Sequence, residues 1–258
     1  RIPGTGSMAL AGLGVAFPII LLISAFSALV GMGGAPRASI CMGQKDNEGA
    51  ERILGSSTAF LIVLSIVLSA IFLIVKEPLL MMFGASENTI VYANQYLGIY
   101  LIGTISVQAA LGLNQFITCQ GFAKTGMMTV LIGAIINIVL DPILIFGFHM
   151  GVSGAALATI ISQTVSAIWV VVFLCSKKSA AVVNRKAMIL SYFQHPLIAF
   201  LNLAPVLLLG VSPFIMQSTE CLVQLTFNTG MQKFGNDFYV GAMTIIFSLS
   251  QMLFLPIQ

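Results

Sequence analysis

Charged side chains are scarce in this sequence of 258 residues: they make up 7% of it, while 58% of the residues are hydrophobic. A soluble globular domain carries about a quarter charged residues, so this shortage excludes an ordinary soluble domain and indicates an integral membrane protein. The apolar runs are long and continuous rather than alternating at every second residue, which favours spanning helices. The sequence therefore predicts an all-α, multi-pass membrane protein.

Other residue types that carry chemistry are also sparse. The four cysteines lie far apart without CxxC spacing, which argues against a disulfide framework or a zinc site. The net charge is only +3 and the basic residues form no patch, so we expect no nucleic-acid partner. Residues 151–154 fit a GxSG pattern, but His195 is predicted on the other side of the membrane and His149 shares the short loop of Ser153, so no base is placed to activate this serine. We predict no enzyme and no cofactor.

Seven membrane-spanning helices are predicted from the apolar runs, at residues 8–32, 53–75, 92–119, 127–148, 155–175, 206–229 and 238–258. The first span is rich in glycine and alanine, which lets helices approach closely in lipid. The chain has no initiator methionine and stops inside an apolar run. We expect it to be an internal piece of a larger protein.

Basic residues are distributed unequally between the two sides of the membrane. Eight of them follow the first, third or fifth span, against three on the opposite side. By the positive-inside rule, the side with eight is cytoplasmic. The cytoplasmic residues are Arg37, Lys45, Arg52, Lys124, Lys177, Lys178, Arg185 and Lys186, and the outer ones are Arg1, Lys76 and Lys233.

Two of the eight acidic residues, Asp141 and Glu220, fall within predicted spans. A carboxylate inside a membrane helix costs roughly 3 kcal/mol on insertion scales, so such residues are functional-site candidates by default. Asn137 lies four residues before Asp141 and therefore on the same helix face. Thr159 and Asp141 are each nine residues from Met150, at the centre of a turn between antiparallel helices, which predicts that they lie at the same depth.

The predicted cation site consists of Asp141, Asn137 and Thr159. Their carboxylate, amide and hydroxyl oxygens suit Na⁺ or a proton rather than a transition metal. A purely structural interpretation stays open, in which Asp141 satisfies backbone groups at the kink imposed by Pro142 and Thr159 hydrogen-bonds its own helix.

A second polar group follows one face of the sixth predicted span. Gln217, Glu220, Gln224 and Asn228 are spaced by three, four and four residues, which places them on a single stripe. A stripe this polar must face a water-filled cavity or other helices rather than lipid. In the functional interpretation, Glu220 binds a cationic substrate or carries a coupling proton, with Gln217 and Gln224 beside it. In the structural interpretation, the stripe is a hydrogen-bonded seam between helices.

Four segments resemble the multidrug and toxic compound extrusion (MATE) transporters: 137–147 (NIVLDPILIFG), 151–159 (GVSGAALAT), 212–220 (SPFIMQSTE) and 241–243 (GAM). The resemblance implies twelve helices in two pseudo-symmetric six-helix lobes, and this chain is similar to helices two to eight. Residues 1–181 would then belong to the first lobe without its first helix, 182–205 to a cytoplasmic linker between the lobes, and 206–258 to the start of the second lobe.

The resemblance also implies a function and a set of residues. Members of this family export cationic, amphiphilic drugs through the inner (plasma) membrane in exchange for Na⁺ or H⁺. Their first-lobe cation site uses positions that match Asn137, Asp141 and Thr159, with an asparagine that matches Asn114. Glu220 resembles an acid used there in coupling or substrate binding. An arginine expected shortly after Asn114 is absent, which departs from the family's pattern at the inner gate. We expect a monomer.

Two other functions are compatible with the sequence. A lipid-linked sugar flippase of similar architecture would need intramembrane lysine or arginine for its anionic headgroup, and no predicted span contains one. A non-transporting membrane subunit would keep its fold when Asp141 and Glu220 are replaced by amides, and efflux would not change.

Overall fold

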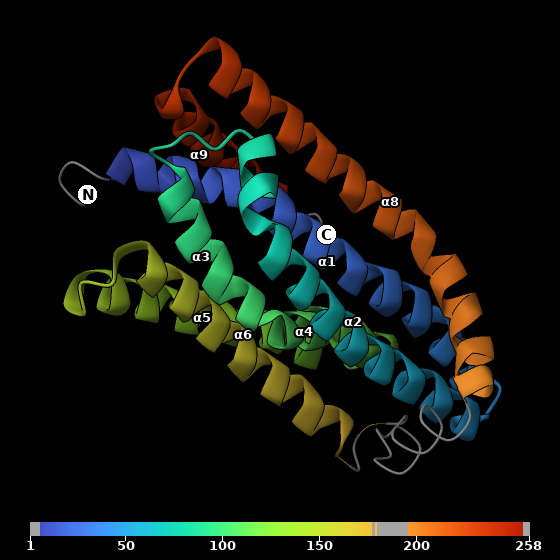
Figure 1. Cartoon of the computed structure of the whole chain (residues 1–258). Helices are drawn as coiled ribbons and strands as arrows, with labels where there is room; N and C mark the ends of the chain where they lie inside the picture. The colour runs from blue at the N-terminus through green and yellow to red at the C-terminus, as the bar shows by residue number, and fades with distance from the viewer. Residues whose placement is uncertain (1–5, 177–178, 180–195, 255–258) are drawn as a thin grey trace.

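The structure, a computed structural model, describes residues 6–176, 179 and 196–254, so most of the predicted linker at 182–205 lies outside the described residues. Every regular element in this part of the chain is a helix (Figure 1), which confirms the all-α prediction. The elements are α1 (Gly6–Gly43), α2 (Asn47–Met82), α3 (Ile90–Ile102), α4 (Thr104–Cys119), α5 (Ala123–Pro142), the π-helical turn η1 (Ile143–Gly147), α6 (Gly151–Leu174), α8 (Pro196–Phe234) and α9 (Asp237–Phe254).

Within the described ranges, five helical segments are long and apolar enough to cross a membrane. They are α1, α2, α5 with η1, α6, and α8. The helices α3 and α4 meet the same criterion only as a pair bent by 62°, and α9 is a shorter apolar helix. The prediction of a multi-pass membrane protein is confirmed, and the predicted number of seven spans is approximate.

The predicted span at 92–119 is divided at Gly103 into α3 and α4. Ile160 of α6 occupies the space where a Cβ atom at this position would lie, so only glycine permits the contact. On the other side of the bend, the hydroxyl of Ser69 on α2 donates a hydrogen bond to the carbonyl of Leu101, 2.7 Å away. Packing from two neighbouring helices therefore fixes a bend within one continuous apolar run.

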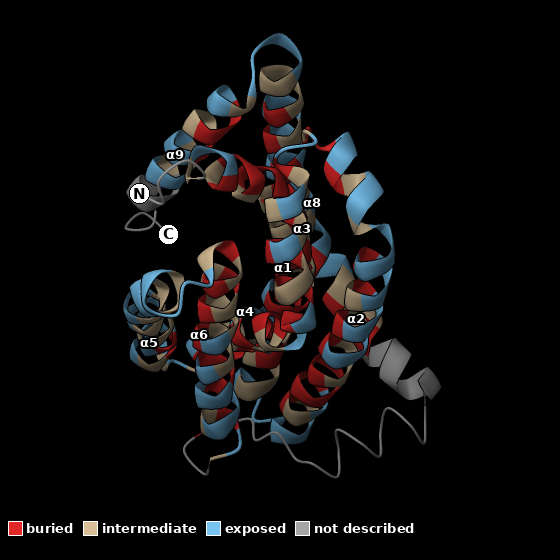
Figure 2. Cartoon of the chain, turned by 60° about the vertical axis from the view of Figure 1, so that its left-hand side comes forward, coloured by how far each residue is buried: buried red, intermediate tan, exposed pale blue. Residues whose placement is uncertain are grey.

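α1 runs through the bundle and contacts α2, α3, α4, α8 and α9, with α8 lying along it (Figure 1). Glycine makes this approach possible, because a Cβ atom at Gly210 would collide with the backbone of Leu29, and one at Gly33 with the backbone of Val206. This agrees with the role predicted for small residues in the first span. Figure 2 shows buried residues concentrated around α1 and α4, whereas α5 is exposed over most of its surface.

Three helices extend beyond the spans predicted for them. α1, predicted to end at residue 32, continues to Gly43, so Arg37 is a helical residue. α2 continues to Met82, so Lys76 and Glu77 are helical residues rather than members of an outer loop. α8 begins at Pro196, so residues 196–205 belong to a helix rather than to the predicted linker. Hydropathy marks only the apolar part of a membrane helix, and polar turns at its ends escape detection.

Candidate cation-binding site

α5 carries the two residues at the centre of the predicted cation site. Asn137 and Asp141 lie one turn apart on this helix, and both are half-buried. The Nδ2 atom of Asn137 and the Oδ1 atom of Asp141 are each buried without a hydrogen-bond partner among the described residues. Other buried side chains of the described residues, such as Ser57 and Gln217, also have an unpaired atom, so what distinguishes this position is that one of the two belongs to a carboxylate within an apolar helix.

Pro142 contributes a further polar group to the same face. Proline has no N–H to offer the carbonyl of Ile138 four residues earlier, and the next amide, that of Ile143, donates instead to Leu140. The helix continues beyond the proline as the π-helical turn η1. The Ile138 carbonyl thus lacks its usual helical donor, and Oδ1 of Asp141 bonds to no backbone group of this kink in the described chain.

Thr159 on α6 and Tyr96 on α3 complete the neighbourhood. The Thr159 hydroxyl donates to the carbonyl of Ala155, 2.9 Å away, and its oxygen lies 3.5 Å from the Tyr96 hydroxyl. The hydroxyl proton of Thr159 is engaged by its own helix, as the structural interpretation expected, but its oxygen lone pairs face the neighbouring helix. α6, which packs against α5, therefore also meets α3 at Thr159.

Asn114 lies elsewhere. Its Nδ2 atom donates to the carbonyl of Gly126, 3.3 Å away, in the first turn of α5. Gly126 is fifteen residues before Asp141, which corresponds to about 22 Å along a helix. The structure therefore does not bring Asn114 to Asp141, in contrast to the placement implied by the resemblance.

The polar stripe predicted on α8 divides between two environments. Gln224 and Asn228 are each 3% exposed and line a small hollow against α1 and α9. Asn228 Nδ2 donates to the carbonyl of Gly14, 2.9 Å away. Glu220 is exposed, and Gln217 is half-buried with an Oε1 atom that has no partner in the described part of the chain. These contacts support a seam between helices for Gln224 and Asn228, and leave Glu220 and Gln217 as candidate substrate contacts.

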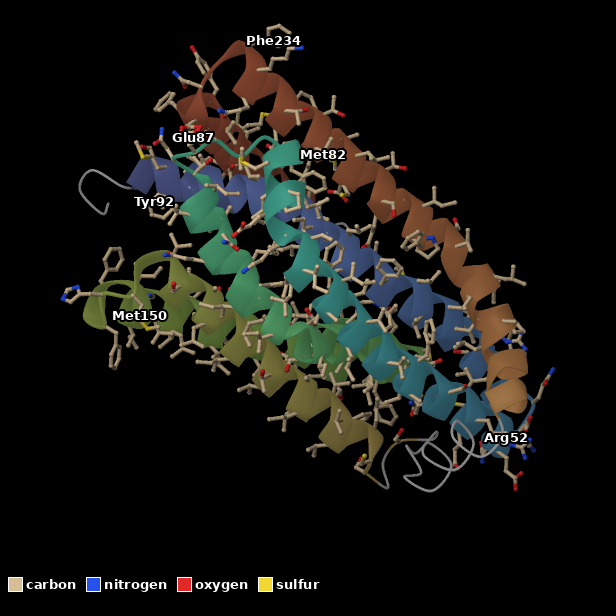
Figure 3. All side chains as sticks on the ribbon, viewed as in Figure 1. Arg52, Met82, Glu87, Tyr92, Met150 and Phe234 are labelled. Atoms are coloured by element: carbon tan, nitrogen blue, oxygen red, sulfur yellow. The ribbon has the colours of Figure 1, made fainter. Side chains whose placement is uncertain are left out.

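Within the described residues, the candidate acids Asp141 and Glu220 have no basic partner. Across residues 6–176, 179 and 196–254, the one ion pair within 4.0 Å joins Arg52 to Glu48. Figure 3 shows Arg52 at one end of the bundle, whereas Met82 and Met150 lie toward the other. A carboxylate kept in an apolar bundle without a basic residue is suited to bind a mobile cation.

Long apolar helices around a lone carboxylate are typical of membrane transporters. Residues 2–143 match the family model MatE. The chain belongs to this family, whose members are membrane transporters rather than enzymes. The resemblance found in the sequence is thereby confirmed.

Individual relatives agree with this assignment. The chain is 31% identical over 213 residues to the multidrug export protein MepA of Staphylococcus haemolyticus (strain JCSC1435), covering 80% of this chain and 46% of that protein. It is 30% identical to the MATE multidrug transporter DinF-BH, solved in complex with R6G, with a TM-score of 0.80 over 97% of this chain and 53% of that one.

The fold is shared with a more distant transporter as well. An inward-facing MATE family transporter of the MOP superfamily is 24% identical and has a TM-score of 0.89, over 98% of this chain and 56% of that one. The chain therefore spans about half the length of the relatives it matches.

Proposed function

We propose that this chain is part of a multidrug efflux transporter of the plasma membrane, a secondary antiporter that acts as a monomer and exports small cationic, amphiphilic compounds in exchange for Na⁺ or H⁺. The observation that carries the proposal is the carboxylate of Asp141 in an apolar helix, with an Oδ1 atom that has no hydrogen-bond partner among the described residues. The names of the relatives support it, because MepA is a multidrug export protein and DinF-BH was solved with R6G.

The coupling cation would bind between α5 and α6. For Na⁺, the ligands are the Asp141 carboxylate, the Asn137 amide oxygen, the Thr159 hydroxyl oxygen and the Ile138 carbonyl, all hard oxygen donors. A proton would need only the Asp141 carboxylate. In either case binding removes an uncompensated negative charge from the apolar bundle, which favours the conformer that holds the site closed.

The substrate would bind nearer to α8. Glu220 offers the second intramembrane carboxylate, and the unpaired Oε1 atom of Gln217 lies one helical turn away. A cationic amphiphile would neutralise Glu220 as the coupling ion neutralises Asp141. If each ligand favours a different conformer, their movements are linked, since a ligand shifts an equilibrium only through its differential affinity.

Replacing Asp141 with Asn in the complete protein tests this function. Ethidium efflux is measured in cells under imposed Na⁺ and pH gradients, varied separately to identify the ion. We expect efflux to fall to the level of cells without the transporter, while the control Glu87→Gln, an exposed outer residue, retains it at equal membrane expression. Undiminished efflux by Asp141→Asn would remove this carboxylate from the mechanism.

The competing functions give different results in the same assay. A non-transporting subunit would leave efflux unchanged when Asp141 and Glu220 are both replaced by amides. A lipid-linked sugar flippase would depend instead on a basic residue, and Lys76, now found inside α2, is the residue to replace.

A further inference from the structure

A small hollow lies where α8 and α9 meet α1. Its volume is about 10 Å³, close to the lower limit of roughly 10–15 Å³ for holding one water molecule. Both of the other helices pack against α1 (Figure 1). The polar lining comes from all three helices: Gly14 of α1, Gln224 and Asn228 of α8, and Thr244 and Ser248 of α9.

Gln224 is the side chain in this hollow that lacks a partner. It is 3% exposed, yet its amide group makes no hydrogen bond with another described residue. Buried amides are almost always bonded to protein or to ordered water, because leaving them unpaired is costly. What distinguishes Gln224 from other buried side chains with an unpaired atom, such as Ser57, is that it lines a hollow of this size. The amide therefore points to a small ligand within the hollow.

The two hydroxyl groups of α9 already use their protons within their own helix. Thr244 donates to the carbonyl of Val240, and Ser248 donates to the carbonyl of Thr244, each over 2.9 Å. Their oxygen atoms consequently present only lone pairs to the hollow. A water molecule can donate to these lone pairs and accept from the Gln224 amide, so it connects polar groups that do not bond to each other directly.

The α1 side of the hollow is shaped by Gly14. A Cβ atom at this position would collide with the Thr244 hydroxyl, so only glycine lets α9 bring that hydroxyl against the α1 backbone. The carbonyl of Gly14 accepts the hydrogen bond of 2.9 Å from Asn228 Nδ2 and retains a second lone pair. Backbone packing thus holds the Thr244 hydroxyl at the hollow independently of any ligand.

The lining argues against two other occupants. Among the described residues, no carboxylate lines the hollow, and Glu220, one turn before Gln224 on α8, is exposed and outside it. A dehydrated cation would therefore meet neutral oxygens only, with its charge uncompensated in an apolar bundle. Phe17 and Phe247 form the remaining walls. The space is far below the roughly 300–1,000 Å³ of a pocket for a drug-sized molecule.

We propose that this hollow is a binding site for one water molecule, which accepts a hydrogen bond from the Gln224 amide and donates one to Thr244 Oγ1. The water links α8 to α9, beside the bond from Asn228 to Gly14 that links α8 to α1. Water-mediated hydrogen bonds are nearly as favourable as direct ones. The hydrated contact therefore stabilises the packing of α9 in this conformer.

A double-mutant cycle in the complete transporter tests the site. Gln224→Met keeps the length of the side chain without its amide, and Thr244→Val keeps the shape without the hydroxyl. The equilibrium constant of unfolding is measured in mixed micelles for the wild type, both single variants and the double variant. Since each single variant already loses the water, we expect the double variant to unfold about fivefold less than the product of the single effects predicts, the value of roughly one hydrogen bond.

Thr226→Val is the matched control for Thr244→Val. Thr226 is exposed on α8 and, like Thr244, donates to the carbonyl four residues earlier, here Leu222 at 2.8 Å. In combination with Gln224→Met its effect should multiply without coupling. A coupling of the same size in both cycles would overturn the proposal, because it would not depend on the hollow.

Two further measurements identify the occupant. A structure of the complete transporter, at a resolution that shows ordered waters, should have a density peak within hydrogen-bond distance of the Gln224 amide and Thr244 Oγ1, and Gln224→Met should lack it. The coupling should be equal in sodium chloride and in choline chloride, since water needs no metal cation. Absence of coupling between Gln224→Met and Thr244→Val, its loss in choline chloride, or coupling without a density peak would overturn the proposal.

Discussion

Asn228 on α8 donates a hydrogen bond of 2.9 Å to the carbonyl of Gly14 on α1, the group that Pro18 leaves without a helical donor. In a regular helix the amide four residues later would serve Gly14, but proline has no N–H. Asn228 is 3% exposed, so neither partner of the bond is served by bulk water. The asparagine amide thus replaces a backbone donor across the helix interface.

This relationship predicts a coupled pair of mutations. Asn228→Leu, which keeps the side-chain volume, should lower the free energy of unfolding by about 1–3 kcal/mol, because it leaves the Gly14 carbonyl buried and unpaired. Pro18→Ala restores the backbone N–H, and in that background the cost of Asn228→Leu should fall by about 1 kcal/mol or more. Equilibrium unfolding of the complete protein in mixed micelles measures all four variants. Equal costs in both backgrounds would contradict the assignment.

The position of the Tyr96 hydroxyl predicts that this group contributes to cation binding. Its oxygen lies 3.5 Å from Thr159 Oγ1. Tyr96→Phe removes one polar neighbour of the site, and we expect about a fivefold weaker apparent affinity for the driving cation, the value of roughly one hydrogen bond. Efflux measured against cation concentration gives this affinity.

The matched control for Tyr96→Phe is Tyr92→Phe. Tyr92 lies on the same helix one turn earlier and is half-buried. Its replacement should leave the cation dependence unchanged. Equal shifts in the two variants would show that loss of any hydroxyl on α3 disturbs transport, and would remove Tyr96 from the site.

Replacements of Asn114 and of Asn137 should differ in their effect on the apparent cation affinity. Asn114 contacts Gly126, which is fifteen residues before Asp141. Asn114→Ala should therefore leave the apparent cation affinity within about twofold of the wild type. Asn137→Ala should weaken this affinity about tenfold or more, because a ligand is lost. The maximal efflux rate is free to change in both. A shift of similar size in both affinities would place Asn114 at the cation site in another conformer.

We expect the hydrogen bond between Ser86 and Asp237 to hold this end of the helix bundle closed. Ser86, between α2 and α3, donates to Asp237 Oδ2 at the start of α9, 3.0 Å away. Hydrogen bonds to charged groups contribute about 1.5–3 kcal/mol, so Ser86→Ala should raise outward opening by about tenfold or more. The measurement is the labelling rate of Gln224→Cys by a membrane-impermeant maleimide, in a background without the native cysteines.

Asn88→Ala serves as the control for this contact, since Asn88 is exposed in the same connection. It should leave the labelling rate unchanged. A Ser86→Ala variant that labels no faster than wild type would show that the bond to Asp237 does not limit opening.

Spacing in the sequence is enough to predict which residues form the centre of the candidate site. Helical periodicity places Asn137 and Asp141 on one face, and the symmetry of the hairpin about Met150 brings Thr159 to the same region. Both depend on local geometry only. Tyr96 is a polar residue in an apolar run, but no spacing rule connects α3 to α6.

Rules of residue spacing do not predict contacts between distant parts of the chain. The division at Gly103 depends on Ile160 packing against it, and the separation of Gln224 and Asn228 from Glu220 depends on the position of α1. Periodicity shows that residues share a face, but not which neighbour covers that face. The family resemblance implies a place for Asn114 at the cation site, whereas the structure has its side chain hydrogen-bonded to the carbonyl of Gly126.

The most direct test of the cation site is equilibrium binding to the purified complete transporter. Uptake of ²²Na⁺ and release of protons are measured for the wild type, Asp141→Asn and the control Glu87→Gln. We predict saturable binding of one of the two cations to the wild type and the control, and its loss in Asp141→Asn. Binding by Asp141→Asn with the stoichiometry and affinity of the wild type would contradict the assignment of this carboxylate as the cation ligand.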